Sequence, residues 1–468
     1  MARTEEKLHI VMFPWLAFGH LIPNLELAKL IAQKGHNISF VSTPRNIERL
    51  PKLSPNLASF IKFVKLPLPK VDKLPENAEA TTDVPYDVVQ YLKKAYDDLE
   101  EPLTRFLESS KVDWLFYDLI PFWAGTVASK LGIKSAFYSI CTPPCMGFLG
   151  PPSVLMGEDP YRTKLKDFTV TPPWISFPTT VAYRYFEMMR NSDAVSDNDS
   201  GISDMYRFGA VIKNCDIVVI RGCTEFEPEW FQVLENIYQK PVLPVGQLIN
   251  REFEGDEDNI TTWQWMKDWL DKQPCGSVVY VAFGSEAKPS QDEVTQIALG
   301  LEESKIRFFW VLRVQRGPWD PDVLRLPEGF EERTKGRGIV CTSWAPQLKI
   351  LSHVAVGGFL THSGWTSVVE AVQNEKPLIL LAFLADQGLN ARVLEEKKMG
   401  YSVPRDERDG SITSDAIANS IRLVMVEDEG RVYREKIKEV KDLFVNTVRQ
   451  EKYIDELLHY LSRNLSNC

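Results

Sequence analysis

The architecture of this chain can be inferred from residues 344–387, which read WAPQLKILSHVAVGGFLTHSGWTSVVEAVQNEKPLILLAFLADQ. The run GGFLT predicts a buried strand, and VVEAV predicts the helix that follows it. Between them, HSGWTS makes the turn from strand to helix. Gly364 lets the backbone approach a ligand closely, and the first turn of the helix directs unpaired N–H groups at that ligand. A diphosphate is the natural ligand of such a turn.

Polar and aromatic side chains around this turn complete a possible nucleotide site. His362, Thr366 and Ser367 add donors, Glu370 lies one turn into the helix where it can accept from ribose hydroxyls, and Trp344 offers a flat face to a base. Each feature alone has a common structural explanation, since a lone buried histidine is usually structural and Ser or Thr at a helix start is usually a cap. Together they predict a nucleotide-binding site.

Alternating strand and helix patterns on both sides of an acidic segment predict an α/β fold with two doubly wound domains. Ser290 and Glu293 form a capping box that opens a helix at residues 294–302. The strands expected in the first series are residues 8–13, 37–42, 61–66, 114–117, 135–140 and 216–220, with helical patterns at 21–32, 88–107 and 123–130. Those expected in the second are residues 277–283, 308–312, 338–342, 357–361 and 378–383.

The polar run NREFEGDED at residues 250–258 predicts a linker between domains at 1–249 and 259–449. Residues 440–465 have a strongly helical pattern. Residues 151–203 are rich in proline, aromatic and polar residues, which indicates long loops with short helices near a substrate. The linker would place the carboxyl ends of both sheets at a shared crevice, the usual ligand position for such sheets.

Composition and net charge argue against two classes of protein, those that bind nucleic acids and those that span a membrane. The chain has 468 residues, 44% hydrophobic and 25% charged, as in ordinary globular proteins. Its 54 Lys and Arg against 64 Asp and Glu give a net charge of −10, which argues against a nucleic acid partner. The longest later apolar run, residues 377–385, is far shorter than the roughly 20 residues that cross a bilayer, so no integral membrane segment is expected. The seven cysteines are scattered without a CxxC pair, which indicates reduced thiols in the cytoplasm.

Residues 344–387 resemble the nucleotide-sugar signature of plant UDP-dependent glycosyltransferases, matching WAPQ, HxAVGGFLTHxGW, S, E and DQ at the family's spacing. The similarity extends over nearly the whole chain and includes FPWLAFGH near the start. It implies a GT-B fold, in which two Rossmann-like domains face each other across a cleft and the final helix, at residues 450–468, packs back on the first domain. STPRNIERLP, EFEPEWF and RDERDGS resemble a branch with sugar-on-sugar transferases and proteins named as rhamnosyltransferases.

The resemblance assigns the donor-binding residues one by one. Trp344 stacks on uracil, with Ala345 and Gln347 close to the base and ribose, and Glu370 binds the ribose. Trp365 lies near the transferred sugar. The hydroxyls of that sugar are bound by Asp386 and Gln387. No cofactor is implied, because the UDP-sugar is a co-substrate.

The same resemblance places the diphosphate against His362, Thr366 and Ser367, together with Ser285 of the loop FGSE. One position departs from the family, which usually has Asn where this chain has Thr366. A hydroxyl is shorter and supplies one donor, so the contact with phosphate is expected to be weaker or mediated by water. Ser363 in place of the commoner Cys should have little effect.

A catalytic pair is expected in the first half of the chain. His20 follows the first strand in AFGHL, and Asp118 ends the strand WLFYD. Two residues this far apart can meet because both lie at carboxyl ends of strands in one sheet. Imidazole can accept a proton from a hydroxyl near neutral pH, and a carboxylate on its other nitrogen fixes the tautomer. Without the resemblance, a histidine at a helix N-terminus and a loop cap would explain both residues.

The expected reaction is an inverting, metal-independent transfer of glucose or rhamnose to a hydroxyl of a lipophilic flavonoid or terpenoid, or its glycoside. The protein is expected to be monomeric. Asp-x-Asp pairs begin at Asp197, Asp256 and Asp320, but they lie in polar or Pro-rich loops and are interpreted as solvated charge. Two alternatives stay open: a UDP-sugar-binding protein without turnover, and a UDP-sugar epimerase. The candidates for an acceptor pocket, which are equally candidates for the core, are Trp15, Phe18, Phe122, Trp123, Met146 and Phe148.

Overall fold

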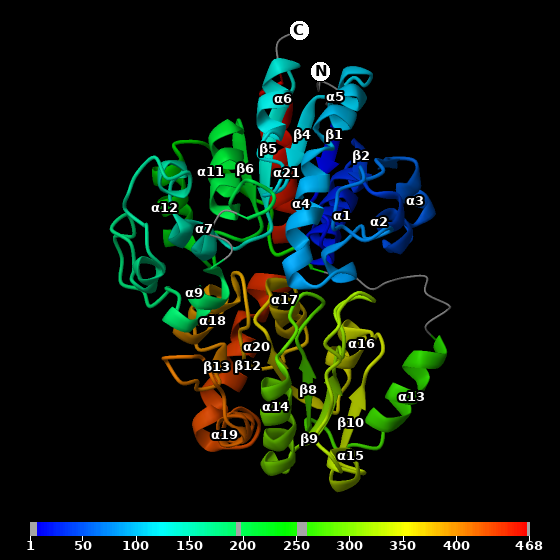
Figure 1. Ribbon diagram of the computed structural model, residues 1–468, viewed down its shortest axis with the longest axis vertical. Coiled ribbons are helices and arrows are strands. Elements are labelled where there is room, and N and C mark those ends of the chain that lie inside the picture. The colour runs from blue at the N-terminus through cyan, green and yellow to red at the C-terminus, as the bar shows by residue number, and fades with distance from the viewer. Residues whose placement is uncertain (1–6, 193–197, 250–259, 466–468) are drawn as a thin grey trace.

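The computed structural model describes residues 7–192, 198–249 and 260–465, which form two parallel sheets with helices on both faces (Figure 1). The first sheet has seven strands in the order β3-β2-β1-β4-β5-β6-β7, and the second has six in the order β10-β9-β8-β11-β12-β13. In both sheets the order reverses beside the first strand, which is the doubly wound topology of Rossmann-like domains. The expected α/β fold is confirmed.

The strands are short, and those in the middle of each sheet are buried. Those of the first sheet are β1 (His9–Phe13), β2 (Asn37–Ser42), β3 (Ile61–Lys65), β4 (Trp114–Tyr117), β5 (Lys134–Ser139), β6 (Ile217–Ile220) and β7 (Val242–Pro244). Those of the second are β8 (Val278–Ala282), β9 (Arg307–Val311), β10 (Gly338–Cys341), β11 (Val356–Thr361), β12 (Leu378–Leu380) and β13 (Gly400–Ser402). The short strands β7 and β13 were not expected from the sequence, because three residues carry too little periodicity to be recognised.

Alternation along the strands explains why helices cover both faces of each sheet. In β1, Val11 and Phe13 pack into one apolar cluster, while Ile10 and Met12 pack into another on the opposite face. The helices of the first half are α1 (Phe18–Gln33), α2 (Pro44–Arg49), α3 (Pro55–Ala58), α4 (Val89–Asp97), α5 (Glu100–Glu108), α6 (Ala124–Lys130), α7 (Pro143–Leu149), α8 (Pro152–Leu155), α9 (Tyr185–Arg190), α11 (Asp204–Asn214) and α12 (Pro228–Tyr238).

The second half begins with α13, and its helices again flank a sheet. The capping box of α14 is confirmed, because the Ser290 hydroxyl accepts from the backbone N–H of Glu293 and the Glu293 carboxylate accepts from that of Ser290. The helices are α13 (Ile260–Leu270), α14 (Gln291–Ser304), α15 (Phe330–Arg333), α16 (Gln347–Ser352), α17 (Trp365–Gln373), α18 (Gln387–Glu396), α19 (Ser414–Met425), α20 (Arg431–Val445) and α21 (Thr447–Arg463).

The final helix leaves the second sheet and packs against the first. Ile454, Leu457 and Leu461 of α21 join the apolar cluster beneath α1, and the Trp114 indole N–H donates to the carbonyl of Leu461 at 3.2 Å. Figure 1 shows α21 running beside α1 and β4. The predicted linker at residues 250–258 lies outside the described residues, so the domain bounds stay a prediction.

Two helical predictions differ in detail. The pattern at residues 88–107 is divided into α4 and α5, and that at 440–465 is divided at Asn446, whose side chain accepts from Arg449 N and starts α21. Residues 151–203, where described, form loops with short helices as expected. No described helix combines the length and apolar character needed to span a bilayer.

Candidate active site

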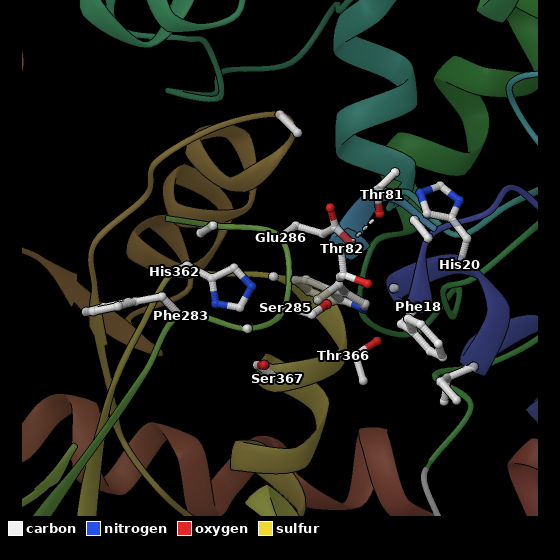
Figure 2. Close-up of a pocket in the computed structure, with 18 of the residues that line it drawn as sticks. Phe18, His20, Thr81, Thr82, Phe283, Ser285, Glu286, His362, Thr366 and Ser367 are labelled. Carbon is white, nitrogen blue, oxygen red and sulfur yellow. Dashed lines mark hydrogen bonds between the residues drawn. The ribbon is translucent and has the colours of Figure 1, made fainter. Parts of the chain in front are cut away.

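A cleft of about 3210 Å³ lies between the carboxyl ends of the two sheets. This is several times the roughly 300–1,000 Å³ of a pocket for one small molecule, so two substrates fit side by side. The turns at both topological switch points border it: those after β1 and β4 from one sheet, and those after β8 and β11 from the other. Figure 2 shows His20 and Phe18 on one side of this cleft, facing His362 and Ser367 on the other.

The structure brings His20 and Asp118 together as the sequence predicts. His20 lies in the first turn of α1 and Asp118 follows β4, and β1 and β4 are adjacent parallel strands with Phe13 opposite Tyr117. The Nδ1 atom of His20 is 2.8 Å from Oδ2 of Asp118. Asp118 is 1% exposed, and it also accepts from the backbone N–H groups of Trp15 and Leu119. These bonds hold the carboxylate in place, and the contact with His20 engages Nδ1 of the imidazole and not Nε2.

The surroundings of His20 shift its pKa. Burial alone would lower the pKa of His20, but the charge and hydrogen bond of Asp118, with smaller contributions from Glu286 and Asp386, raise it above the ordinary value of 6.5. A raised pKa makes the neutral imidazole a stronger proton acceptor, provided that it is still populated at the working pH.

This environment predicts an acidic limb in the pH profile. A general base acts in its neutral form, so activity should be present above the pKa of His20 and lost as the pH falls through it. We expect kcat/KM for the acceptor to decline on the acid side with an apparent pKa above 6.5. Initial rates between pH 5 and 9 at saturating donor measure this, and an apparent pKa below the ordinary histidine value would contradict the assigned environment.

On the facing wall, His362 closes the turn between β11 and α17. A Cβ built on Gly364 would meet the imidazole of His362 at 2.3 Å, and one built on Gly284 at 2.8 Å, so glycine is needed on both sides of the ring. Burial lowers the pKa of His362 to about 4, so the ring is neutral at physiological pH. It therefore acts as a hydrogen-bonding group, and the predicted position beside a diphosphate fits that property.

Three of the residues expected to bind the donor, Gln347, Ser367 and Glu370, form one polar cluster between α16 and α17. The side-chain amide of Gln347 donates to the Ser367 hydroxyl at 2.9 Å and to the Glu370 carboxylate at 2.8 Å. Trp344 borders the cleft beside them with 56% of its surface exposed, which leaves its ring available for stacking. Ala345 and Ser285 also line the cleft.

Asp386 and Gln387 lie at the start of α18, in a loop held by both halves of the chain. The side-chain oxygen of Gln387 accepts from the backbone of Phe383 and Leu384, which leaves its NH₂ group for a ligand. From the first half, the Tyr183 hydroxyl donates to the Ala385 carbonyl at 3.1 Å. Burial raises the pKa of Asp386, while the hydrogen bond from Asn390 and the charge of His20 act in the opposite direction. The loop is thus braced at the edge of the cleft.

The side chain of Trp365, which the resemblance places near the transferred sugar, is mostly buried. The indole is 4% exposed, packs against Phe226 and Phe444, and donates from Nε1 to the Gln247 side chain at 2.8 Å. Trp365 borders the cleft, but its ring is part of the core, because the first residue of α17 turns its side chain toward α20.

Four of the six residues predicted for the acceptor pocket do not border the cleft. Trp15 and Phe18 border the cleft, but Phe122, Trp123, Met146 and Phe148 do not. Trp123, Met146 and Phe148 are fully or almost fully buried among other apolar side chains, and Phe122 packs edge-on against Tyr206. The apolar lining comes instead from residues that the sequence did not single out: Leu119, Ile120, Leu149, Met188, Met205 and Phe208.

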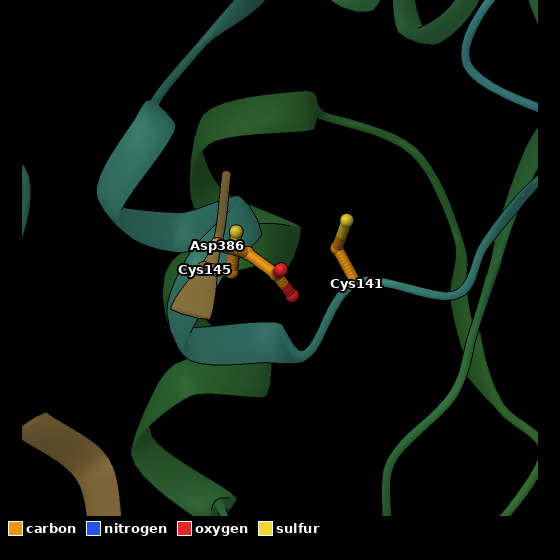
Figure 3. Close-up of side chains that lie close together, drawn as sticks. All are labelled: Cys141, Cys145 and Asp386. Carbon is orange, nitrogen blue, oxygen red and sulfur yellow. The ribbon is translucent and has the colours of Figure 1, made fainter. Parts of the chain in front are cut away.

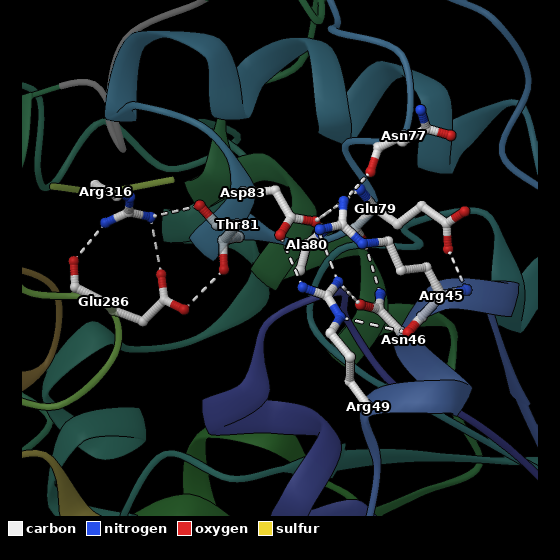
Figure 4. Close-up of polar contacts among 10 residues, drawn as sticks. All are labelled: Arg45, Asn46, Arg49, Asn77, Glu79, Ala80, Thr81, Asp83, Glu286 and Arg316. Carbon is white, nitrogen blue, oxygen red and sulfur yellow. Dashed lines mark hydrogen bonds and ion pairs between the residues drawn. The ribbon is translucent and has the colours of Figure 1, made fainter. Parts of the chain in front are cut away.

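Two further groups at the cleft were missed. Arg221 directly follows β6 and donates to the Thr366 hydroxyl at 2.7 Å; the rule that located His20, a polar residue at the carboxyl end of a strand, would have found it. The second group joins the halves of the chain (Figure 4): Arg316 bonds to the Glu286 carboxylate and the Thr81 carbonyl, while the Thr81 hydroxyl donates to Glu286 at 2.7 Å. No motif in the sequence indicates this contact.

Two thiols lie near the loop that carries Asp386. The sulfur atoms of Cys141 and Cys145 and a carboxylate oxygen of Asp386 all lie within 4.8 Å of one another. Figure 3 shows the Asp386 carboxylate beside Cys145 and directed toward the loop that carries Cys141. The hydrogen bond with Cys141 and burial raise the pKa of Cys145 well above its ordinary value, so the Cys145 thiol is protonated near neutral pH.

The Asp-x-Asp pairs have separate environments. Asp197, Asp256 and Asp258 lie outside the described residues. Asp199 is exposed and pairs with Lys73, as solvated charge would. The expectation is wrong for Asp320, which is 4% exposed, pairs with Lys288 at 2.6 Å and accepts from the backbone of Arg316. This carboxylate has a structural role that loop composition alone does not reveal.

Comparison with known proteins agrees with this geometry. A family model described as UDP-glucoronosyl and UDP-glucosyl transferase matches residues 232–447. UDP-glycosyltransferase 91A1 of Arabidopsis thaliana is 52% identical over 462 residues, which span 98% of this chain and 97% of that protein. Soyasaponin III rhamnosyltransferase of Glycine max is 41% identical over 470 residues, which span 98% of this chain and 96% of that protein.

A solved structure supports the same conclusion. That of Phytolacca americana UGT2, complexed with UDP-2fluoro-glucose and pterostilbene, is 28% identical and superposes with a TM-score of 0.73, covering 97% of this chain and 99% of that one. The two facing doubly wound sheets are the GT-B fold, and the donor of such enzymes is a UDP-sugar. The chain therefore belongs to the UDP-glucoronosyl and UDP-glucosyl transferase family and is a UDP-glycosyltransferase.

Proposed function

We propose that this enzyme transfers the sugar with inversion, using His20 as general base. The observation that carries the proposal is the His20–Asp118 pair across the cleft from the first turn of α17. His20 takes the proton from an acceptor hydroxyl, and the oxygen attacks the anomeric carbon from the face opposite UDP. Asp118 stabilises the imidazolium that forms. The bond to UDP breaks, and its negative charge is held at the helix terminus without a metal ion.

The donor is proposed to lie along the turns after β8 and β11. Uracil stacks on Trp344, and the ribose hydroxyls meet Glu370, which Gln347 holds in place. The diphosphate lies at the start of α17 beside Thr366, Ser367 and His362. The transferred sugar reaches Asp386 and the free amide of Gln387. This order places the anomeric carbon on the side of His20.

The proposed acceptor is a lipophilic compound that already carries a sugar. The apolar lining of the first half suits a triterpenoid or flavonoid body. Beside it the cleft is polar, with Gln90 and the Lys93–Asp204 pair, which are able to bind sugar hydroxyls. Two relatives have names that fit such an acceptor: the soyasaponin III rhamnosyltransferase, and an anthocyanidin-3-O-glucoside rhamnosyltransferase of Petunia hybrida that is 31% identical.

Product mass spectrometry tests this proposal. The purified protein is incubated with UDP-glucose or UDP-rhamnose and a panel of flavonoid and terpenoid aglycones, each beside its monoglucoside. A mass gain on monoglucosides alone would support sugar-on-sugar transfer and name the donor. A gain on aglycones would replace it with first-sugar transfer, and conversion of donor without any acceptor would point to an epimerase.

The position of Thr366 gives a separate prediction about the donor. Its hydroxyl lies at the start of α17 and accepts from Arg221. An asparagine side chain there offers a carbonyl oxygen to Arg221 and an amide donor to phosphate. Thr366→Asn should therefore preserve or raise the affinity for UDP-sugar, measured by calorimetry. A large fall in affinity would mean that the hydroxyl has a role which the amide cannot replace.

A further inference from the structure

Arg221 is a buried cation that reaches from the first half of the chain to the proposed diphosphate site. It follows β6, and the residue is 2% exposed. Its Nη1 atom donates to the hydroxyl of Thr366, 145 residues later, at 2.7 Å. Thr366 is the second residue of α17, and both residues border the cleft. The guanidinium therefore lies at the helix terminus where an anion is expected.

The guanidinium is held in a fixed position. Its Nε donates to the carbonyl of Gln247 at 2.9 Å, and Nη2 is 3.5 Å from the carbonyl of Leu248. The side chain of Gln247 in turn accepts from the Trp365 indole. Arginine has five N–H donors, and these contacts engage one on each nitrogen, so Nη1 and Nη2 each keep a second N–H for a ligand.

The charge of Arg221 lacks a close counter-ion among the described residues. Three other cations that border the cleft form ion pairs: Lys93 with Asp204, Arg49 with Asp83 and Arg190 with Glu293. Arg221 forms no ion pair with a carboxylate in the described part of the chain; its three partners are two carbonyls and a hydroxyl. Burial lowers the pKa of Arg221. The negative charges of Glu370 and Glu26 act to raise it, although neither carboxylate forms an ion pair with the guanidinium. A buried charge is costly unless an anion compensates it.

We propose that Arg221 binds the diphosphate of the donor and supplies the positive charge that offsets it. The inference rests on the proposed position of the diphosphate at the start of α17. It also accounts for Thr366: a hydroxyl that accepts from Arg221 is oriented to donate its own proton to a phosphate oxygen. The pair thus provides a charge and a hydroxyl donor where the family usually has one asparagine.

Calorimetry with UDP and with uridine tests this role, because uridine shares the base and ribose but lacks the phosphates. Arg221→Met should weaken UDP binding by about 10- to 100-fold, the range expected on losing a charged hydrogen-bond donor. Its affinity for uridine should stay within about twofold. Arg221→Lys should recover part of the loss, because lysine keeps the charge but not the planar set of donors.

Lys52→Met is the matched control, because Lys52 is an exposed cation that also borders the cleft. This variant should bind UDP like the wild type. Equal binding of UDP by Arg221→Met and the wild type would overturn the proposal, and so would equal losses for UDP and uridine, which indicate a structural role. If Arg221→Met does not fold, Arg221→Lys allows the same comparison of UDP with uridine, with a smaller loss expected for UDP. Failure of the wild type to bind UDP would instead overturn the proposed donor site.

Discussion

His20→Ala is expected to lower kcat for transfer to a hydroxyl by about 10²- to 10⁴-fold, the usual contribution of a general base. In the proposed mechanism the Nε2 atom of His20 is the proton acceptor, because Nδ1 is engaged by Asp118 at 2.8 Å. UDP binding should be nearly unchanged, since the proposed donor site lies on the facing wall. Initial rates with saturating donor and calorimetry with UDP measure the two effects.

The chain offers a matched control for this substitution. His353 forms a second histidine–carboxylate pair, with Asp271 at 3.0 Å, and does not border the cleft. His353→Ala should therefore keep kcat. If His20→Ala retained full activity, the base would have to be another group, and if it also lost UDP binding, the effect would be structural.

Asp118→Asn is expected to produce a second large loss of kcat, again of about 10²- to 10⁴-fold. The carboxylate of Asp118 accepts from His20 and from two backbone N–H groups, and its charge raises the pKa of His20. An amide is neutral and has a single acceptor oxygen, so it stabilises the imidazolium less and allows the wrong tautomer.

The acid limb of the pH profile distinguishes this role from a structural one. In Asp118→Asn the apparent pKa of His20 should fall, because burial lowers this pKa and the charge of Asp118 that raises it is then absent. Asp271→Asn provides the control and should leave both kcat and the profile unchanged. A variant of Asp118 with reduced kcat but an unmoved acid limb would show that the carboxylate does not act on His20.

Much of the site could be predicted because its residues have a local signal. Asp118 directly follows an apolar strand, His20 lies at the start of the helix after another, and the turn at residues 362–367 has a strand before it and a helix after it. The carboxyl ends of parallel strands gather at one edge, so residues with this signal meet whatever their separation in the sequence. Arg221 carried the same signal after β6 and was overlooked because it belongs to no recognised motif.

The apolar residues that border the cleft from the first half of the chain had no such signal in the sequence. Trp123 and Phe148 were candidates as large apolar residues in loops of the first half, yet they pack into the core, while Met205 and Phe208 border the cleft. Composition does not separate these two groups, because a core and an apolar pocket wall are built from the same side chains. Which of them faces solvent depends on the direction of each side chain once α7 and α11 are packed.

The sequence by itself determined the two parallel sheets, the turns that carry the candidate site residues, and the family. These depend on local periodicity and on short motifs. The tertiary structure alone decided which side chains meet across the cleft. Arg221 with Thr366, and Arg316 with Glu286 and Thr81, combine residues from both halves of the chain. Such contacts depend on how the two sheets face each other, and that packing leaves no periodic signal in the residues it joins.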